Sequence, residues 1–242
     1  TLPAAVAGLK TCGIRGFNLT MPNKNKIVEL LDELSPEAQL IGAVNTVLND
    51  NGKLIGYNTD GYGFMQSVRD AGHDITGKNI TVMGVGGASM AICAQSALDG
   101  AASVHIFARR TSRYWNRTQK FAENLSAKTG CQVCLFDNDD HTALRDSIAQ
   151  SYLLINATSV GMVPDIDDTI IKDTSLFHPE LVVADVVYEP QETRLLREAK
   201  AAGCQTFNGM YMLLHQGAKA FQIWTGQEMP VSVIKEKYFS VK

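Results

Sequence analysis

A glycine-rich turn between an apolar strand and a helix constrains the fold of this chain more than any other feature. The apolar run 80–83 leads into Gly84, Gly86 and Gly87, and small or apolar residues follow at helical spacing up to Leu98. Glycines permit positive φ and let a pyrophosphate approach the backbone, while a helix N-terminus offers unpaired N–H groups to an anion. The segment predicts a dinucleotide-binding strand–turn–helix unit, with a plain glycine-rich turn as the alternative.

Strands and helices alternate after this turn. We expect strands at residues 103–107, 132–136, 152–156, 181–185 and 205–207, and helices at 118–128, 141–149 and 193–201. Strands that alternate with helices of this length indicate a parallel sheet with helices on both faces. The central part of the chain therefore predicts an α/β fold with a Rossmann-type doubly wound sheet.

The residues before the glycine turn mix short helices and strands. We expect a helix at 1–12, a strand at 14–20 and a β-hairpin at 43–58. A further helix after Pro22 is expected from the helical spacing of its apolar residues, which are Ile27, Leu30, Leu31 and Leu34.

The tail of the chain carries two helical patterns and no strand pattern. Because it has no sheet of its own, we expect it to fold back on the first segment. The expected division is a smaller, incomplete α/β substrate lobe at 1–60, a nucleotide-binding lobe at 61–208 and C-terminal helices at 209–242. A dinucleotide on the central lobe would face the cleft between the lobes.

Charge, hydropathy and cysteine content narrow the class of protein. The 242 residues carry a net charge of −3 without a basic patch, which argues against nucleic acid as a partner. No apolar run approaches the ~20 residues that a membrane span needs. Five scattered cysteines indicate reduced thiols and a cytoplasmic protein. Cys131 and Cys134 lack a second pair at zinc-site spacing, so we expect no metal.

A series of motifs in a fixed order resembles the shikimate dehydrogenase family. The motifs are GFNLTMPNK at 16–24, GAVNT at 42–46, GYNTDG at 56–61, GVGGA at 84–88, NATSVGM at 156–162, and Gly209, QGA and WTG in the tail. Their wording is most similar to the quinate/shikimate dehydrogenase branch. The resemblance implies NAD(P)-dependent oxidation of shikimate or quinate to the 3-dehydro acid, and the reverse reduction, in aromatic amino acid biosynthesis.

The chemistry of alcohol oxidation also needs such residues, because a group must remove the hydroxyl proton while hydride leaves. Lys24 and Asp60 end two loops that would face the nucleotide lobe, and they are candidates for this pair. The resemblance assigns Lys24 as the general acid/base and Asp60 as the residue that positions it and hydrogen-bonds a substrate hydroxyl. By the same resemblance, ring hydroxyls are bound by Asn45 and Gln216, with Thr20 and Tyr188 as weaker contacts.

Each of these residues has a plainer interpretation when taken alone. A lysine after a proline is usually a solvated surface residue, and an aspartate before a glycine usually caps a helix or turn. Asn45 could satisfy a neighbouring backbone group, and Gln216 could be exposed on its helix. As an ordered set, the residues favour the functional interpretation.

The residues after the second strand of the central lobe bear on the choice of cofactor. A carboxylate at this point binds the adenosine 2′-hydroxyl, whereas arginine favours a 2′-phosphate. Here the strand ends in FARRTSR at 107–113, without an acid. NADP is therefore favoured over NAD, with solvation of the loop by its arginines as the alternative. The expected cofactor-binding residues are Gly84, Val85, Gly86, Gly87, Ala88, Ala108, Arg109, Arg110, Thr111, Ser159, Val186 and Gly209.

The sequence departs from the family pattern at two places. Family members carry a Ser-x-Ser pair for the substrate carboxylate in a preceding segment, which is not found before Thr1. We expect either a fragment of a longer protein or a lobe completed by a partner, with a homodimer as one arrangement. Tyr211 stands where a second glycine is usual, and it either narrows the nicotinamide pocket or packs outward.

Two further hypotheses remain open at this point. One is another two-lobed NAD(P)-dependent oxidoreductase, and the other is a nucleotide-binding module without catalysis. The second predicts cofactor binding without turnover. The choice between shikimate and quinate and the oligomeric state are also left open by the sequence.

Overall fold

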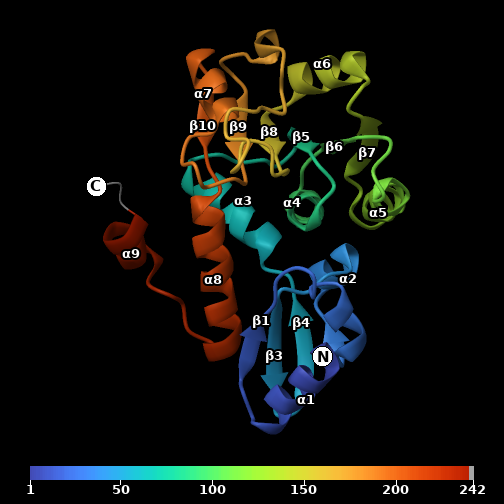
Figure 1. The fold of residues 1–242 in the computed structure, drawn as a ribbon, viewed down its shortest axis with the longest axis vertical. Coiled ribbons are helices and arrows are strands. Elements are labelled where there is room, and N and C mark those ends of the chain that lie inside the picture. The colour runs from blue at the N-terminus through green and yellow to red at the C-terminus, as the bar shows by residue number, and fades with distance from the viewer. Residues whose placement is uncertain (240–242) are drawn as a thin grey trace.

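A six-stranded parallel sheet forms the larger lobe of the chain in a computed structural model, which describes residues 1–239 (Figure 1). Its strands stand in the order β10-β9-β8-β5-β6-β7, and every neighbouring pair is parallel. The strands are β5 (Asn79–Met83), β6 (Ser103–Ala108), β7 (Gln132–Asp137), β8 (Leu153–Asn156), β9 (Val182–Asp185) and β10 (Gln205–Phe207). The predicted doubly wound sheet is confirmed.

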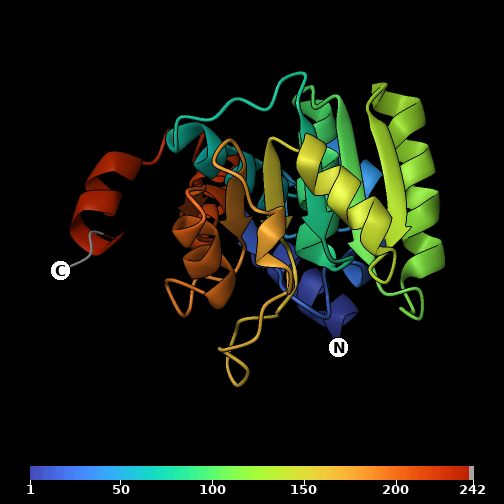
Figure 2. The same ribbon diagram turned by 90° about the horizontal axis from the view of Figure 1, so that it is seen from above.

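Helices cover both faces of this sheet, which is why its central strands are almost entirely apolar (Figure 2). On one face, α4 (Gly87–Leu98) and α5 (Trp115–Thr129) pack on Ile80, Val104 and Ile106. On the other face, α6 (His141–Gln150) and α7 (Arg194–Ala201) pack on Phe107, Leu154 and Val183. The two apolar clusters share the sheet and hold the lobe together.

The strand order of the sheet reverses at β5, which lies between β6 and β8. The connections after β5 and β8 leave in opposite directions, so a crevice opens at the carboxyl ends of these strands. Gly84 follows β5 and Ala157 follows β8. The predicted glycine turn therefore lies at the position where open α/β sheets bind ligands.

A four-stranded sheet forms the smaller lobe, in the order β1-β3-β4-β2. The expected hairpin is confirmed, because Asn51 and Gly52 join β3 and β4 with φ of 52° and 94°. Ser35 caps the second helix by accepting a hydrogen bond from the Ala38 N–H. The elements are α1 (Leu2–Thr11), β1 (Gly16–Asn18), β2 (Glu33–Leu34), α2 (Pro36–Ile41), β3 (Thr46–Asp50) and β4 (Lys53–Tyr57).

The helix expected after Pro22 is wrong over most of its length. A 3₁₀ turn covers only Lys26–Leu30, Leu31 is extended, and Leu34 lies in β2 beside Gly56 of β4. A Cβ at Gly56 would lie 2.5 Å from Leu31 Cδ1 and 3.0 Å from Leu34 Cδ2. The apolar stripe thus packs as an edge strand over a glycine, and pairing with β4 overrides the helical spacing.

Two helices connect the lobes, α3 (Asp60–Asp70) and α8 (Met210–Thr225) (Figure 1). Gly61 brings α3 against α4, since a Cβ there would lie 2.2 Å from the Ala91 carbonyl oxygen. Gly63 brings α3 equally close to α8, with 2.7 Å from its Cβ position to the Met212 carbonyl oxygen. The tail returns to the smaller lobe, because α8 runs alongside β3.

The far end of α8 and the residues after it add further contacts. Trp224 Nε1 donates a hydrogen bond to the Val47 carbonyl oxygen at 2.9 Å. The short helix α9 (Val231–Ile234) and a π-helical turn at Lys235–Phe239 follow, and Lys235 pairs with the Asp70 carboxylate. None of the helices within residues 1–239 is long and apolar enough to cross a membrane.

We expect Gly61→Ala to lower the free energy of unfolding by about 1–3 kcal/mol, because the added methyl group must push α3 away from the α4 backbone. Gly8→Ala is the matched control, since no atom lies within 4 Å of a Cβ there, and it should stabilise α1 by about 0.5–1 kcal/mol. Urea denaturation measures both. Equal stability of the two variants would contradict the close helix contact.

Candidate active site

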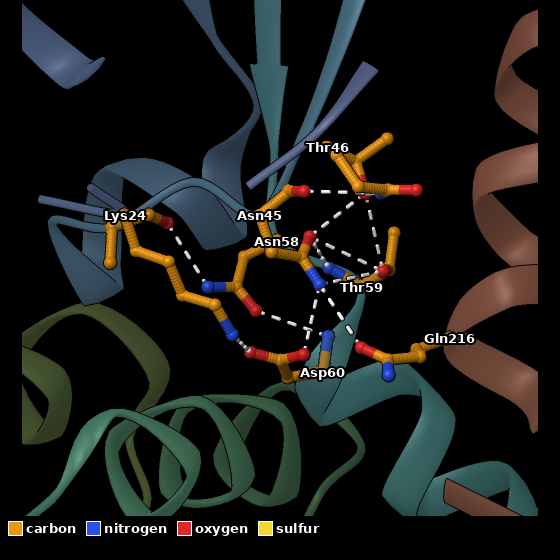
Figure 3. Close-up of polar contacts among 9 residues, drawn as sticks. Lys24, Asn45, Thr46, Asn58, Thr59, Asp60 and Gln216 are labelled. Atoms are coloured by element: carbon orange, nitrogen blue, oxygen red, sulfur yellow. Dashed lines mark hydrogen bonds and ion pairs between the residues drawn. The ribbon is translucent and has the colours of Figure 1, made fainter. Parts of the chain in front are cut away.

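An ion pair between Lys24 and Asp60 lies where the smaller lobe meets α3 (Figure 3). Lys24 Nζ donates to Asp60 Oδ2 at 2.7 Å. The two side chains are 19% and 6% exposed, so they are largely shielded from water. A charge-assisted hydrogen bond of this length fixes the ammonium group in one direction. The sequence candidates for proton transfer are thus in direct contact.

Asn45 holds the second oxygen of Asp60. Its Nδ2 donates to Asp60 Oδ1 at 2.9 Å, to Thr59 Oγ1 at 3.0 Å and to Gln216 Oε1 at 3.3 Å. Its Oδ1 accepts hydrogen bonds from the Thr59 N–H and the Thr46 hydroxyl, each at 2.9 Å. Because both ends of the amide are satisfied, its orientation is set by the network (Figure 3).

The start of α3 is shaped by residues that the sequence alone does not single out. Asn58 Oδ1 accepts the Asp60 N–H at 3.1 Å, and its Nδ2 donates to the Ala43 carbonyl oxygen at 3.1 Å. This Asx turn directs the Asp60 side chain towards Lys24. The available signal is the position of Asn58 and Thr59 inside the same GYNTDG motif as Asp60.

These polar groups line a cavity of about 460 Å³. Every substrate-binding residue predicted from the sequence lines it except Tyr188, namely Thr20, Lys24, Asn45, Asp60 and Gln216. Tyr188 follows β9, is 42% exposed and does not line this cavity. An ammonium group, a carboxylate, two amides and a hydroxyl around one space suit a small molecule with several hydroxyl groups.

The glycine turn has the geometry that an approaching phosphate needs. Gly84 has φ of +112°, and a Cβ there would lie 2.8 Å from Thr158 Cγ2. Gly86 and Gly87 differ, because no protein atom lies within 4 Å of a Cβ at either position. Ser89 stands where the fingerprint often has a third glycine, and its hydroxyl donates to the Gly84 carbonyl oxygen. The residues present therefore fit the pyrophosphate of a dinucleotide at the N-terminus of α4.

A second cavity, of about 260 Å³, joins this turn to the catalytic candidates. Gly86 and Gly87 line it from the nucleotide lobe, and Lys24 lines it from the smaller lobe. Tyr114 and Arg117 of the α5 region complete the wall, and the sequence motifs do not point to either residue. Lys24 thus lines both the polar cavity and the cavity at the glycine turn.

The residues expected at the adenosine end follow Ala108, the last residue of β6. Arg109, Arg110 and Thr111 are exposed. The guanidinium group of Arg110 lies over the Trp115 ring at 4.8 Å. Asp137 at the end of β7 is engaged with this loop, since its carboxylate accepts the Arg110 N–H at 3.3 Å.

The residues expected at the other end of the cofactor lie after β8 and β9. Ser159 is exposed in the loop after β8, and Val186 directly follows β9. A Cβ at Gly209 would lie 2.1 Å from the Val186 carbonyl oxygen, so this position requires glycine. Tyr211 packs outward, with Lys235 over its ring at 4.3 Å.

The cysteines have the character of structural residues. Burial raises the pKa of the Cys93 thiol to about 12 and that of Cys131 to about 11, so both thiols are protonated at neutral pH. Among residues 1–239, no group of three or more His, Cys, Asp and Glu side chains is arranged to hold a metal ion.

Comparison with known proteins identifies the family. Residues 1–47 match the shikimate dehydrogenase substrate binding domain, and residues 209–237 match the shikimate 5′-dehydrogenase C-terminal domain. A shikimate dehydrogenase (NADP(+)) from Listeria innocua is 51% identical over 238 residues, which are 98% of this chain and 81% of that protein. The chain belongs to the shikimate dehydrogenase family.

Other relatives agree with this assignment. A quinate/shikimate dehydrogenase from Escherichia coli is 42% identical, over 98% of this chain and 82% of that protein. A crystal structure of shikimate 5-dehydrogenase from Listeria monocytogenes, in complex with shikimate and NAD, superposes with a TM-score of 0.95. That protein is 50% identical, and the match covers 97% of this chain and 81% of that one. The predicted resemblance to the shikimate dehydrogenase family is confirmed.

Gly86→Ala and Gly84→Ala should separate a ligand requirement from a folding requirement. With no protein atom near its Cβ, Gly86→Ala should keep the stability of the original chain but weaken dinucleotide binding about tenfold or more. Gly84→Ala should destabilise the fold, because its φ is positive and its Cβ would meet Thr158. Fluorescence titration and thermal melting measure the two effects. Unchanged binding in Gly86→Ala would contradict a phosphate at this turn.

Proposed function

We propose that this chain catalyses the NADP-dependent oxidation of shikimate to its 3-dehydro acid and the reverse reduction. One observation carries the proposal: Lys24, held by Asp60 at 2.7 Å, lines both the polar cavity and the cavity at the glycine turn. A secondary alcohol in the first cavity and a dinucleotide in the second would both reach this lysine. Proton transfer and hydride transfer need that arrangement.

Lys24 Nζ takes the hydroxyl proton during oxidation and returns it during reduction. Asp60 keeps the nitrogen in position through its Oδ2, while its Oδ1 is held by Asn45. When bound, the nicotinamide dinucleotide accepts the hydride in one direction and supplies it in the other. The low exposure of the Lys24–Asp60 pair keeps water from competing for the proton.

The remaining polar groups of the cavity orient the substrate ring. Asn45 and Gln216 bind ring hydroxyls, because an amide can donate and accept hydrogen bonds at the same site. Thr20 adds a hydroxyl from the loop before Lys24. Tyr188 stays a prediction as a substrate contact, since it does not line the cavity. Residues 1–60 and 209–242 together would form the substrate lobe.

Residues 61–208 would bind NADP across the carboxyl edge of the large sheet. The pyrophosphate would lie on Gly84, Val85, Gly86, Gly87 and Ala88, and the 2′-phosphate beside Arg109, Arg110 and Thr111. The NADP(+) name of the Listeria innocua relative supports this choice. NAD is the alternative, because the Listeria monocytogenes crystal structure contains NAD. A cytoplasmic location and a homodimer stay predictions.

Quinate is the alternative substrate. The Escherichia coli relative is named a quinate/shikimate dehydrogenase, and quinate offers a similar set of hydroxyl groups to Asn45 and Gln216. Initial rates with each acid and each cofactor, measured on this chain, decide between the four combinations. Cofactor binding without turnover of either acid would favour the non-catalytic module.

We expect Lys24→Ala to lower kcat by a factor of about 10²–10⁴, because the proton acceptor is lost. NADP affinity should stay within about twofold, since the glycine turn is unchanged. Lys26→Ala is the control, an exposed lysine two positions further along the chain. Full activity of Lys24→Ala would refute the role of Lys24 in proton transfer.

Arg109→Ala and Arg110→Ala should each raise the KM for NADP about tenfold or more, because an arginine that contacts the 2′-phosphate would be lost. The KM for NAD should change little, since NAD lacks that phosphate. Arg113→Ala is the matched control, because the Arg113 guanidinium group lies over the Tyr114 ring at 4.8 Å. Equal increases in KM for both cofactors would contradict recognition of the 2′-phosphate.

A further inference from the structure

Asp185, at the end of β9, is a completely buried carboxylate that the proposed reaction does not use. Its Oδ1 accepts hydrogen bonds from Asn156 Nδ2 at 3.0 Å and from the Val187 N–H at 2.9 Å. Its Oδ2 accepts one from the Thr193 hydroxyl at 2.8 Å. Within residues 1–239, no ion pair to it is found at 4.0 Å or less. A buried carboxylate without a cation is costly, so its hydrogen bonds need an explanation.

The Asn156 side of this network controls the loop after β8. Asn156 Oδ1 accepts hydrogen bonds from the Thr158 N–H at 3.1 Å and from the Thr158 hydroxyl at 2.7 Å. Its Nδ2 also donates to the Val160 carbonyl oxygen at 3.1 Å. The loop that carries Ser159 is therefore bound on both sides of that residue by one amide. Asp185 in turn holds the amide.

The Val187 side of the network controls the loop after β9. Because Asp185 holds the Val187 N–H, the chain turns immediately after the strand. Val186 then meets Gly209 so closely that a Cβ at Gly209 would lie 2.1 Å from the Val186 carbonyl oxygen. Gly209 also donates its N–H to the Val187 carbonyl oxygen at 3.3 Å. The start of α8, the helix that carries Gln216, is thus packed on the same loop.

We propose that Asp185 is a positioning residue, whose buried carboxylate sets the loops after β8 and β9 relative to each other at the nicotinamide end of the cofactor site. The inference rests on the proposed function, because it assumes that Ser159, Val186 and Gly209 face the cofactor. Asp185 acts through Asn156 and Val187 and does not itself touch substrate or cofactor. Burial raises the pKa of Asp185, while its three hydrogen bonds oppose that rise.

Substitutions at Asp185 and Thr193 test the proposal by comparing the two ends of the cofactor. Asp185→Asn and Thr193→Val should each lower kcat about tenfold, because a displaced nicotinamide is poorly aligned for hydride transfer. Adenosine 2′,5′-bisphosphate, a fragment that lacks the nicotinamide, should bind each variant within about twofold of the original chain. Thr193→Ser keeps the hydroxyl and should restore kcat.

Two variants in the same lobe control for general loss of stability. Ser147→Ala removes a hydrogen bond of 2.9 Å to His105 Nδ1. Asp140→Ala removes the N-cap of α6, which matters because Thr193 also caps α7. Both controls should lower the melting temperature, as Thr193→Val does, but keep kcat within about twofold.

The outcomes separate this inference from the proposed function. Unchanged kcat in both Asp185→Asn and Thr193→Val overturns the positioning role, and so does a loss of fragment affinity that parallels the loss of kcat. If Asp185→Asn does not fold, the Thr193→Val and Thr193→Ser pair decides alone. Failure of the original chain to bind NADP or to oxidise shikimate and quinate would instead overturn the proposed function.

Discussion

The close packing of three helix backbones at Gly61 and Gly63 is the constraint on which the site depends. A Cβ at Gly61 would lie 2.2 Å from the α4 backbone, and one at Gly63 would lie 2.7 Å from the α8 backbone. The helix that begins at Asp60 is therefore held between the helix after the glycine turn and the helix that carries Gln216. Interiors packed this tightly transmit small shifts, so the position of Asp60 is tied to both lobes.

The course of the chain follows from this arrangement. Neither lobe alone contains the polar cavity, because Lys24 and Asn45 come from the smaller lobe and Gln216 comes from α8. The last long helix has to return past the large sheet to supply its amide, and Trp224 anchors its far end to β3. Lys24 then lies at the junction, where it lines the cavity of each proposed ligand.

Each lobe uses an asparagine to hold a buried carboxylate, with different results. Asn45 donates to Asp60 at 2.9 Å, and Asn156 donates to Asp185 at 3.0 Å. The second oxygen of Asp60 meets a lysine beside a cavity, whereas that of Asp185 meets the Thr193 hydroxyl in the interior. The first arrangement suits proton transfer, and the second suits the fixing of loops. Hydrogen bonding makes the burial of both carboxylates tolerable.

Local patterns in the sequence determined the doubly wound sheet, the glycine turn, the hairpin and the candidacy of Lys24 and Asp60, because these depend on neighbouring residues. Only the tertiary structure decided that Leu31 and Leu34 pack as an edge strand over Gly56, since the competing partner belongs to another strand. The contact between Asn45 and Gln216 spans 171 positions, and that between Asp185 and Asn156 spans 29. Such pairs leave no periodic signal, so the networks that hold the site emerge only when the chain has folded.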